Sequence, residues 1–593
     1  MLLKNVEFTQ ILMIMNFTKK LLYPTLFALL VYLTSCVSTK LPETYKVDPE
    51  VLEAKGGKVA FNVSGTIPEK SFHKKAVVEF SPYLSYDGKT QDLKKFTLRG
   101  EKTEGEGTVI NSKTGGSFSY SEEFDYMDDM RASELMVNAT ITKGKKVQEV
   151  NGIKLADGII TTYQNVVHDE KTILAPSGYE KVTIVSEKAT IYFRQNMYNL
   201  DWNFSLNKSD EAKAQMETLK SFIDRGWEIK DIEIDAWASP EGEVDFNDNL
   251  ADDRAATANK FMEKHMDKKF KECAKKKGVD VSEVEQEIAY KAKGHGEDWD
   301  GFMESVKNSN LTDKNTILNV VNSQPDANKR EQEIRNMTVI YKEVEDDILP
   351  ALRRAEIVVN SYEPKRTDEE IAQLAATSPD SLNYKELLHA ATLTDDHQAK
   401  YNIYRAGFAF EDRDWKTYNN AAVEAIELGM VDEADNLLGQ ASKLATKNGV
   451  IENNKGVVAC HRGDYATAEQ HFIAAQNYGE DVLYNMGIVM VQKGEYQKAL
   501  TYFKDIKCKH NVGLAQLLSG KTNDAMNNLK CSPESAQTNY MLAVYGARTN
   551  NADMVYEYLA KAVAKDASMK PYAKEDREFL KYFNEPAFTQ IVD

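Results

Sequence analysis

The first patterned part of the chain alternates apolar and polar residues with a period of two. The alternating apolar positions are Val59, Phe61, Val63, Val77, Phe80, Leu135, Val137 and Ile141. This period is typical of half-buried strands, and glycine-containing turn signals separate the runs. Because no amphipathic helical pattern interrupts them, we predict an antiparallel β-sandwich over residues 58–170. Residues 36–57 are polar and are predicted to form a tether.

From about residue 180, segments with the apolar spacing of a strand alternate with segments that have the apolar spacing of a helix. Residues 181–193 and 229–238 have strand character, while residues 210–226 carry apolar positions at helical spacing. Strands that alternate with helices predict an α/β unit. We place it at residues 180–345, with the run MTVIY at 337–341 as its last strand.

Beyond residue 415, glycine, alanine, asparagine and aromatic residues return every 31 to 34 positions. The recurring residues are Gly429, Gly463 and Gly494, Ala434, Ala468 and Ala499, Tyr465 and Tyr496, and Asn454 and Asn485. The period resembles that of tetratricopeptide repeats, in which small residues let paired helices cross closely. We predict an α-solenoid over residues 381–593, after a linker at 346–380. Such a stack offers a concave face for a peptide or protein partner.

The N-terminus has the order of a bacterial lipoprotein signal. Lys19 and Lys20 precede an apolar run of about 13 residues, which is too short to span a bilayer as a helix. Translation is expected to start at Met15, and residues 1–35 are predicted to be a cleaved signal peptide. The sequence Leu-Thr-Ser-Cys at 33–36 resembles the lipobox, so Cys36 is the expected lipidation site. The alternative is a short uncleaved anchor.

Charge and cysteine usage narrow the classes of function. A formal net charge of -18 repels nucleic-acid phosphates, so a nucleic-acid role is not expected. Surface-exported lipoproteins of Bacteroides relatives, which this chain resembles, usually carry an acidic cluster after the cysteine. None follows Cys36, which favours the periplasmic face of the outer membrane. No Cys/His cluster suggests a metal. Cys508 and Cys531 are a possible disulfide, with free buried thiols as the alternative.

The stretch from Ala238 to Met262 carries a motif that can be compared with a known family. Its sequence is ASPEGEVDFNDNLADDRAATANKFM, and the residues at motif positions are Gly242, Asn247, Leu250, Arg254 and Ala255. These residues match the pattern D-x-x-G, N, L-S-x-x-R-A of the peptidoglycan-binding OmpA-like domain, and Gly294 to Glu297 resembles its later G-x-G-E element. The resemblance implies that residues 180–345 adopt the OmpA-like fold.

The resemblance also implies a ligand. In the family an aspartate holds the ammonium of diaminopimelate in the wall peptide, and the arginine holds its carboxylate through a bidentate fork. Arg254 would provide the fork, whereas Ser239 stands where the family has aspartate. Asp235 or Glu241 would then have to supply the missing charge. The alternative is a retained fold that serves as an interaction platform, with Arg254 in a local salt bridge.

These features favour a multidomain, non-catalytic adaptor. The expected partners are the outer membrane through the lipid, peptidoglycan through the OmpA-like domain, and an envelope protein of an assembly or secretion complex through the repeats. A surface-exposed or fimbria-associated scaffold is the alternative. An enzyme would need a nucleophile with its base, a carboxylate pair or a metal set, and the sequence has no GxSxG or HxxxH motif. No cofactor is expected. Ser381 lies in a possible O-glycosylation sequon.

Overall fold

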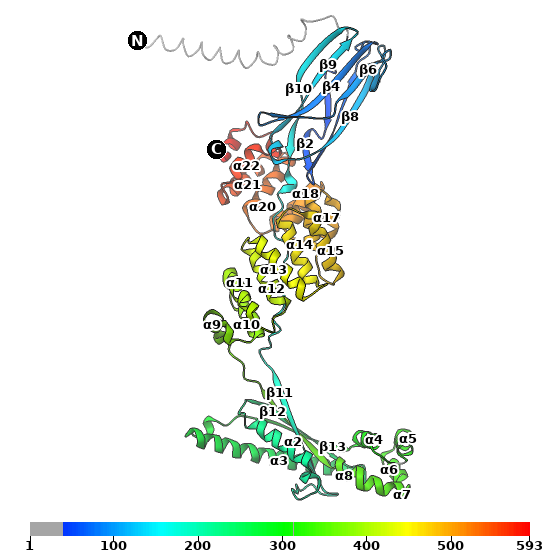
Figure 1. Ribbon diagram of the computed structural model, residues 1–593, viewed down its shortest axis with the longest axis vertical. Coiled ribbons are helices and arrows are strands. Elements are labelled where there is room, and N and C mark those ends of the chain that lie inside the picture. The colour runs from blue at the N-terminus through cyan, green and yellow to red at the C-terminus, as the bar shows by residue number, and fades with distance from the viewer. Residues whose placement is uncertain (1–38, 312) are drawn as a thin grey trace, which may run out of the picture. The chain divides into compact units, whose positions relative to one another are not determined.

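The computed structural model describes residues 39–311 and 313–593 (Figure 1). The predicted signal peptide, the start at Met15 and Cys36 lie outside the described residues. The chain divides into two compact units. The first unit combines the residues up to Pro176 with Thr394–Asp593, and the second is Ser177–Leu393. The second unit is therefore inserted into the sequence of the first. No helix in the described part of the chain combines the length and the apolar content that a bilayer span needs.

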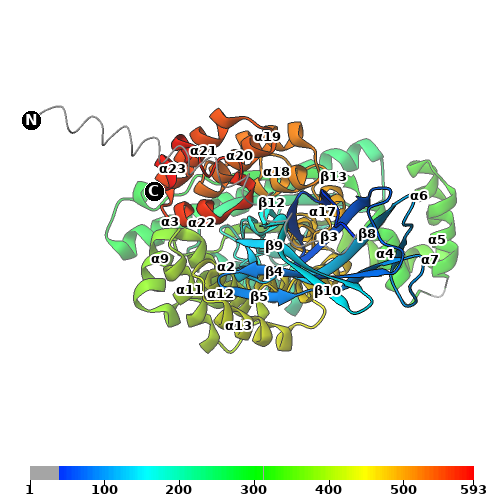
Figure 2. The ribbon, with the colours of Figure 1, turned by 90° about the horizontal axis from the view of Figure 1, so that it is seen from above.

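The N-terminal part of the first unit is a sheet domain. Its strands are β1 (Tyr45–Asp48), β2 (Val51–Lys55), β3 (Lys58–Ile67), β4 (Ala76–Tyr86), β5 (Lys89–Asp92), β6 (Phe96–Gly100), β7 (Thr108–Ile110), β8 (Gly116–Asp125), β9 (Ser133–Lys143) and β10 (Lys146–Ile160). One sheet contains β1, β3 and β8, the other runs β10-β9-β4-β6-β7, and β2 pairs with both β3 and β10. Pairing is antiparallel except for β2 with β10 and β6 with β7. Figure 2 shows β4 between β9 and β5.

The core of the sheet domain is built by the residues that alternate in the sequence. Ile67 and Phe118 come from one sheet, and Val78, Phe80 and Val137 come from the other; all are almost completely buried in one cluster. Alternate residues of a strand point to opposite faces, so each sheet supplies one apolar face to this cluster. The prediction of an N-terminal sheet domain with an alternating apolar core is therefore confirmed, whereas β2 joins all ten strands into one connected sheet and two of its pairings are parallel.

The boundaries of the sheet domain differ from the prediction. The expected tether at residues 36–57 contains β1 and β2, and Leu52 in β2 is fully buried. β2 is joined to β3 through Gly56 and Gly57, which both have positive φ, as a tight hairpin requires. At the other end, regular strand structure stops at Ile160 and not at residue 170. The tether was wrongly assigned because two strands of four and five residues give little periodicity.

The C-terminal part of the first unit is a stack of helix pairs. The helices are α11 (His397–Ala406), α12 (Trp415–Glu427), α13 (Val431–Leu444), α14 (Gly449–His461), α15 (Tyr465–Asn477), α16 (Leu483–Gln492), α17 (Tyr496–Tyr502), α18 (His510–Leu518), α19 (Thr522–Cys531), α20 (Ala536–Arg548), α21 (Ala552–Lys565), α22 (Met569–Glu575) and α23 (Pro586–Val592). Pairs form between consecutive helices from α12 to α21. A side chain at Gly456 in α14 would collide with the ring of Phe472 in α15, and one at Gly487 in α16 with the ring of Phe503, directly after α17. These two glycines are therefore explained by close helix crossings, whereas Gly429 and Gly463 have positive φ.

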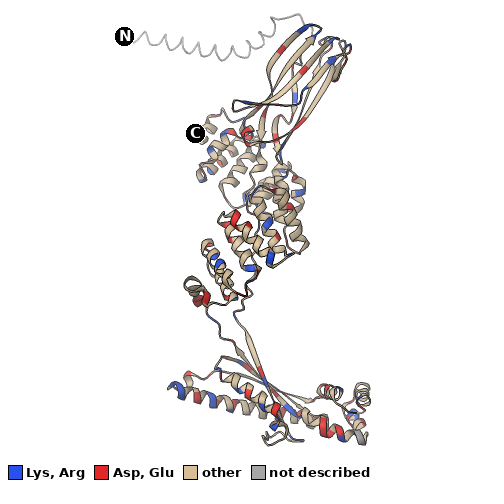
Figure 3. Cartoon of the chain, in the orientation of Figure 1, with Lys and Arg blue, Asp and Glu red and all other residues tan. Residues whose placement is uncertain are grey.

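The second unit is an α/β unit. It contains the strands β11 (Ile184–Tyr192), β12 (Ile229–Ala238), β13 (Ala289–Glu297) and β14 (Arg354–Tyr362) and the helices α2 (Asp210–Ile223), α3 (Val244–Lys277), α4 (Trp299–Asn308), α5 (Lys314–Ser323), α6 (Ala327–Arg335), α7 (Thr338–Glu343), α8 (Leu349–Leu352), α9 (Asp368–Thr377) and α10 (Tyr384–Ala390). The sheet order is β11-β14-β12-β13, with β12 and β13 parallel. Residues of α2 and α3 share one core with residues of β11, β12 and β14. In Figure 3, residues coloured as acidic and as basic follow one another along the cartoon of α3.

The last strand of this unit is not the predicted one. The run at 337–341 enters α7, and the strand β14 comes from the stretch at 346–380 that was expected to be a linker. Ala355, Ile357 and Val359 are fully buried, and β14 lies between β11 and β12. A five-residue apolar run fits a helix or a strand equally well, so the sequence alone could not separate the two. The insertion between β13 and β14 is helical and has its own apolar cluster.

Candidate functional site

Buried asparagine side chains line one face of the repeat helices. The first helix in each of four successive pairs carries one or two buried asparagines. They are Asn419 and Asn420 in α12, Asn453 and Asn454 in α14, Asn485 in α16, and Asn511 in α18. All six are at most 2% exposed. We refer to these six residues as the asparagine row. Buried amides are costly without hydrogen-bond partners, so the row indicates that a polar chain is bound against it.

The partner of the asparagine row is a segment of the same chain, residues 165–175, which we call the strap. The strap has no helix or strand. The Lys171 N–H donates to Asn485 Oδ1 at 2.7 Å, and Asn485 Nδ2 donates to the Lys171 carbonyl at 2.9 Å. The same two-bond contact, at 2.8 to 2.9 Å, joins Val167 to Asn511, Ile173 to Asn454, and Ala175 to Asn420. The row therefore holds an extended main chain at four points.

The remaining asparagines connect these four contacts. Asn453 Nδ2 donates to the Lys171 carbonyl at 2.9 Å, and Asn419 Nδ2 donates to the Ile173 carbonyl at 3.1 Å. The amides also bond to one another across helix pairs, because Asn485 Nδ2 donates to Asn453 Oδ1 at 3.0 Å. An amide has a fixed donor side and a fixed acceptor side, so these bonds set the orientation of each group. The row and the strap form one connected network.

One charged side chain fixes the register of the strap. Asp169 accepts a hydrogen bond of 2.5 Å from the Tyr484 hydroxyl and pairs with Lys509 at 2.9 Å. Burial and the bond to this carboxylate raise the pKa of Tyr484, so the phenol stays protonated and donates. A shift of the strap by one residue would move Asp169 away from both partners. The asparagines hold the main chain, and this contact selects which part of the chain they hold.

Next to this anchor lies a group of titratable side chains. The Glu170 side chain is completely buried and lies 3.2 Å from His168 Nδ1, and the His168 ring stacks on that of His461. The hydrogen bond to Glu170 raises the pKa of His168, whereas burial lowers the pKa of His461 and raises that of the Cys460 thiol. A buried, protonated thiol is a poor nucleophile. No set of three His, Cys, Asp or Glu residues arranged for a metal occurs in residues 39–311 and 313–593.

The structure changes the expectation for the concave face of the repeats. The sequence predicted a surface open to a partner, whereas the face of α12, α14, α16 and α18 that carries the asparagine row is occupied by the strap. The strap itself gives no sequence signal because its contacts are mainly through main-chain atoms. In the sequence, Asn454 and Asn485 recur with the period of the repeats. Polar residues that recur inside otherwise apolar helices indicate that a main chain is bound there.

In the second unit, Arg254 of α3 points into the protein. It has no solvent exposure, and its guanidinium donates to the main-chain carbonyls of Met197 at 3.0 Å, Trp237 at 2.9 Å and Arg194 at 3.2 Å. Burial, together with nearby Arg353, lowers its pKa to about 10. The platform alternative expected Arg254 to form a salt bridge with a neighbouring acid of α3, but its donors point to main-chain carbonyls instead. In this conformation the guanidinium offers no fork to an external carboxylate.

Ser239 and its neighbours form a second buried cluster. The Ser239 hydroxyl donates to Glu241 Oε1 at 2.7 Å, and Arg353 Nη2 pairs with the same carboxylate at 2.6 Å. Glu241 is therefore placed where it could replace the missing aspartate, but its charge is balanced by Arg353. Asp235 is engaged elsewhere, because its carboxylate bonds to His295 at 2.5 Å.

Gly242 and Asn247 shape the turn that carries this cluster. Gly242 has φ +102°, a conformation that favours glycine, and its N–H donates to Glu331 at 2.6 Å. Asn247 Nδ2 donates to the Glu241 carbonyl at 3.0 Å and to Glu297 at 2.8 Å. The structure thus brings Ser239, Glu241, Gly242 and Asn247 together. Ligand binding at these residues stays a prediction. Ser381, the possible glycosylation site, is exposed after α9.

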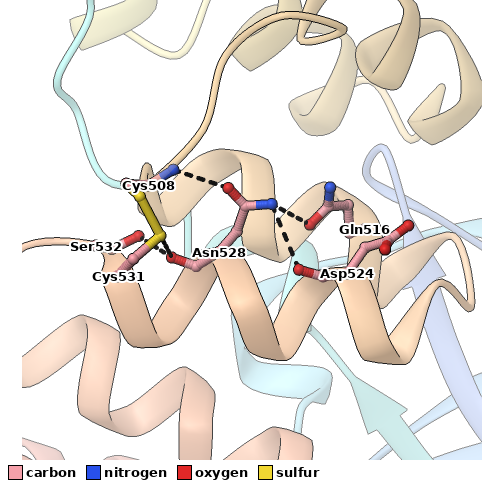
Figure 4. The surroundings of a disulfide bond; sticks show 6 residues. All are labelled: Cys508, Gln516, Asp524, Asn528, Cys531 and Ser532. Atoms are coloured by element: carbon pink, nitrogen blue, oxygen red, sulfur yellow. Dashed lines mark hydrogen bonds between the residues drawn. A yellow bond between two sulfur atoms is a disulfide. The ribbon is translucent and has the colours of Figure 1, made fainter.

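The predicted pairing of Cys508 with Cys531 is present as a disulfide (Figure 4). It joins the segment before α18 to the end of α19. Asn528 supports it, since its side-chain oxygen accepts from the Cys508 N–H at 2.8 Å and its Nδ2 donates to Gln516 at 2.9 Å. Cys273 and Cys460 are free.

Replacing Cys508 and Cys531 together by serine should destabilise the first unit. The bond spans 23 residues, and loss of a loop constraint of this size costs about 3 kcal/mol. Denaturant unfolding would measure the change, with Cys273→Ser as the control that should leave stability unchanged. Dithiothreitol should lower the stability of the wild type and have no effect on the double variant. Equal stability of wild type and double variant would contradict a structural role for the bond.

Comparisons with known proteins give only distant likenesses to solved structures. No protein-family model and no curated protein matches the chain. Similar solved structures include a tetratricopeptide repeat protein from Parabacteroides merdae, with 14% identity over 44% of this chain and 96% of that chain and a TM-score of 0.29. PilW, a type IV pilus biogenesis factor, has 18% identity over 37% and 100%, with a TM-score of 0.27. Yeast Tom70 has 11% identity over 48% and 68%, with a TM-score of 0.25.

At these identities we transfer no partner or activity from the similar structures. The paired helices and their recurring residues define the class of the chain: it is a multidomain protein with an N-terminal sheet domain and C-terminal helical repeats that resemble a tetratricopeptide solenoid. Within this class the chain has one particular feature. The face of its repeats that carries the asparagine row binds a segment of the same chain.

Proposed function

We propose that the chain is a non-catalytic scaffold of the bacterial envelope, anchored in the outer membrane by lipid on Cys36 and facing the periplasm. The observation that carries the scaffold role is the grip of the asparagine row on the strap. This grip joins the sheet domain to the repeats, so the surfaces of both parts keep a fixed geometry. A scaffold needs such a frame because partners that bind a rigid surface lose less free energy to ordering.

The grip also gives the repeat face a structural task. Four two-bond contacts to the strap main chain leave no free asparagine on this face for a partner, so protein partners are expected on other surfaces of the first unit. The second unit then contributes a further docking surface. Its buried Arg254, which bonds to three carbonyls, supports a structural use of the motif.

The scaffold role can be tested on detergent-solubilised membranes. The wild-type chain should take up a palmitate analogue and migrate on native gels in an assembly much larger than its own 66.9 kDa. Cys36→Ala should abolish labelling and release the chain from the membrane fraction. A chain that migrates as a monomer in the wild type would contradict the scaffold proposal, and labelling that persists in Cys36→Ala would contradict the anchor.

A second candidate function is peptidoglycan binding by the α/β unit. Glu241 favours it, because its carboxylate lies 2.7 Å from the Ser239 hydroxyl, at the place where the OmpA-like motif has aspartate. Binding would require Arg254 to exchange its carbonyl partners for a ligand carboxylate. Co-sedimentation of the full chain with purified sacculi tests this candidate. Retention that free diaminopimelate competes away, and that Ser239→Asp increases, would support it; no retention of either form would exclude it.

A further inference from the structure

Strand β8 has a free edge. Over its whole length, Gly116–Asp125, it pairs with β3 on one side, and no other strand among the described residues pairs with it. The register between β3 and β8 is continuous, without a bulge, and β8 contains no proline. Proteins commonly protect sheet edges with short strands, bulges or prolines. The other edge strands of the sheet domain, β1, β5 and β7, have three or four residues each, so β8 differs from them in its length; the edge strands of the second unit's sheet, β11 and β13, have nine residues each.

The pairing pattern shows which main-chain groups face outward. The Tyr126 N–H donates to the Gly57 carbonyl at 2.8 Å, in register with the β3–β8 ladder. Hydrogen-bonded and non-hydrogen-bonded pairs alternate in an antiparallel ladder. The outward N–H and C=O groups therefore belong to Ser117, Ser119, Ser121, Glu123 and Asp125. All five residues are exposed, and their main-chain groups have no hydrogen-bond partner in the described part of the chain.

The charge along this edge is uneven. The first half of β8 has serines, whereas Glu122, Glu123 and Asp125 lie within its last four residues. Lys58 is 3.3 Å from both Glu123 and Asp125, so one ammonium group serves two exposed carboxylates. The inward side chains of β8, including Phe118 and Tyr120, continue the apolar face of the sheet. A strand added here would meet apolar contacts on one side and net negative charge at one end.

We propose that β8 is a docking edge for an extended, basic segment of a partner protein, which adds to the sheet as an antiparallel strand. In this orientation the N-terminal half of the partner segment lies beside the carboxylates of Glu122 to Asp125, and its lysine or arginine side chains complement them. A second copy of this chain would bring a further acidic edge and matches less well. This inference rests on the proposed scaffold role. It adds the chemical character of one protein partner, a basic extended segment.

A labelled model peptide tests this edge on the full chain. The probe is a ten-residue peptide of alternating threonine and valine with two lysines in its N-terminal half, and its control has glutamates in place of the lysines. Fluorescence anisotropy should show at least tenfold tighter binding of the lysine peptide. Hydrogen exchange of the outward amides in β8 should slow when it binds. Equal binding of the two peptides, or unchanged exchange in β8, would overturn the proposal.

Variants at one position separate the edge from the fold. Ser119→Pro removes an outward N–H while the inward ladder to β3 remains, so binding should weaken at least tenfold. Ser119→Ala keeps the N–H and should bind as the wild type does. Glu123→Lys should reduce the preference for the lysine peptide even if the proline variant folds poorly. Self-association of the wild type that Ser119→Pro abolishes would identify a second copy as the occupant and would refute a basic partner. These outcomes concern β8 alone. Failure of the β8 proposal can therefore be distinguished from failure of the scaffold role, which the native-gel experiment tests separately.

Discussion

Replacing Asn454 and Asn485 together by alanine is expected to lower the free energy of unfolding of the first unit by about 4 kcal/mol. Each side chain satisfies one N–H and one C=O of the strap, at Ile173 and Lys171. Asn419 and Asn453 still donate to the carbonyls, whereas the two N–H groups lose the partners that they have among the described residues. A buried polar group without a partner costs about 1–3 kcal/mol, and the cavities add to this. Denaturant unfolding measures the loss.

The strap should respond locally as well. Hydrogen exchange at Lys171 and Ile173 is expected to accelerate much more than exchange in the core strands of the sheet domain. Asn477→Ala is a matched control, because Asn477 is exposed at the end of α15 and bonds to no part of the strap. If the double variant were as stable as this control, the strap would not be an integral part of the unit, and the frame on which the proposed function rests would be lost.

Arg254→Met is expected to lower the stability of the second unit by about 3 kcal/mol. The change removes a buried group that donates to three main-chain carbonyls, of which the Arg194 carbonyl keeps the Met197 N–H at 3.1 Å. Tryptophan fluorescence suits the measurement, because Trp202, Trp227, Trp237 and Trp299 belong to this unit and only Trp415 lies outside it.

Arg194→Met provides the control for loss of charge. Its side chain is about half exposed and pairs with Asp201, so its removal should change stability by about 0.5 kcal/mol or less. Equal, small effects of the two variants would show that Arg254 is not a structural residue. If Arg254→Met does destabilise the unit strongly, loss of sacculus binding in this variant could result from unfolding and would not identify a ligand contact. Competition by free diaminopimelate on the wild type is therefore the decisive measurement.

Sequence patterns predicted the elements whose side chains pack against a single core. The alternating positions of β3, β4 and β9 and the recurring alanines of the repeats, Ala434, Ala468 and Ala499, are explained by burial on one face. The recurring glycines Gly429 and Gly463 have a different cause, because they adopt positive φ in exposed turns. The same reasoning misplaced the last strand of the α/β unit. Residues 337–341 and 354–362 both contain short apolar runs, and only the pairing of β14 with β11 and β12 decides between them. Long-range pairing leaves no trace in a short window.

The candidate sites were harder to predict for two different reasons. The strap is held through its main chain, which every sequence has, so its own residues carry no signal. Arg254 lies at the position that the motif predicts, but the direction of its guanidinium depends on carbonyls of a loop at 194–197 and of Trp237. The disulfide could be proposed because it needs only two cysteines at the two ends of one helix pair, α18 and α19.

The insertion of the second unit has a consequence for how the polypeptide matures. The strap ends just before Ser177, whereas the helices that receive it begin only after Leu393. The part made first therefore cannot reach its final state until the part made last has emerged, because contacts so distant in sequence form late. In the meantime the strap presents unpaired main-chain groups to any neighbour. The strap should therefore need shielding from other chains until α12 to α18 have been synthesised.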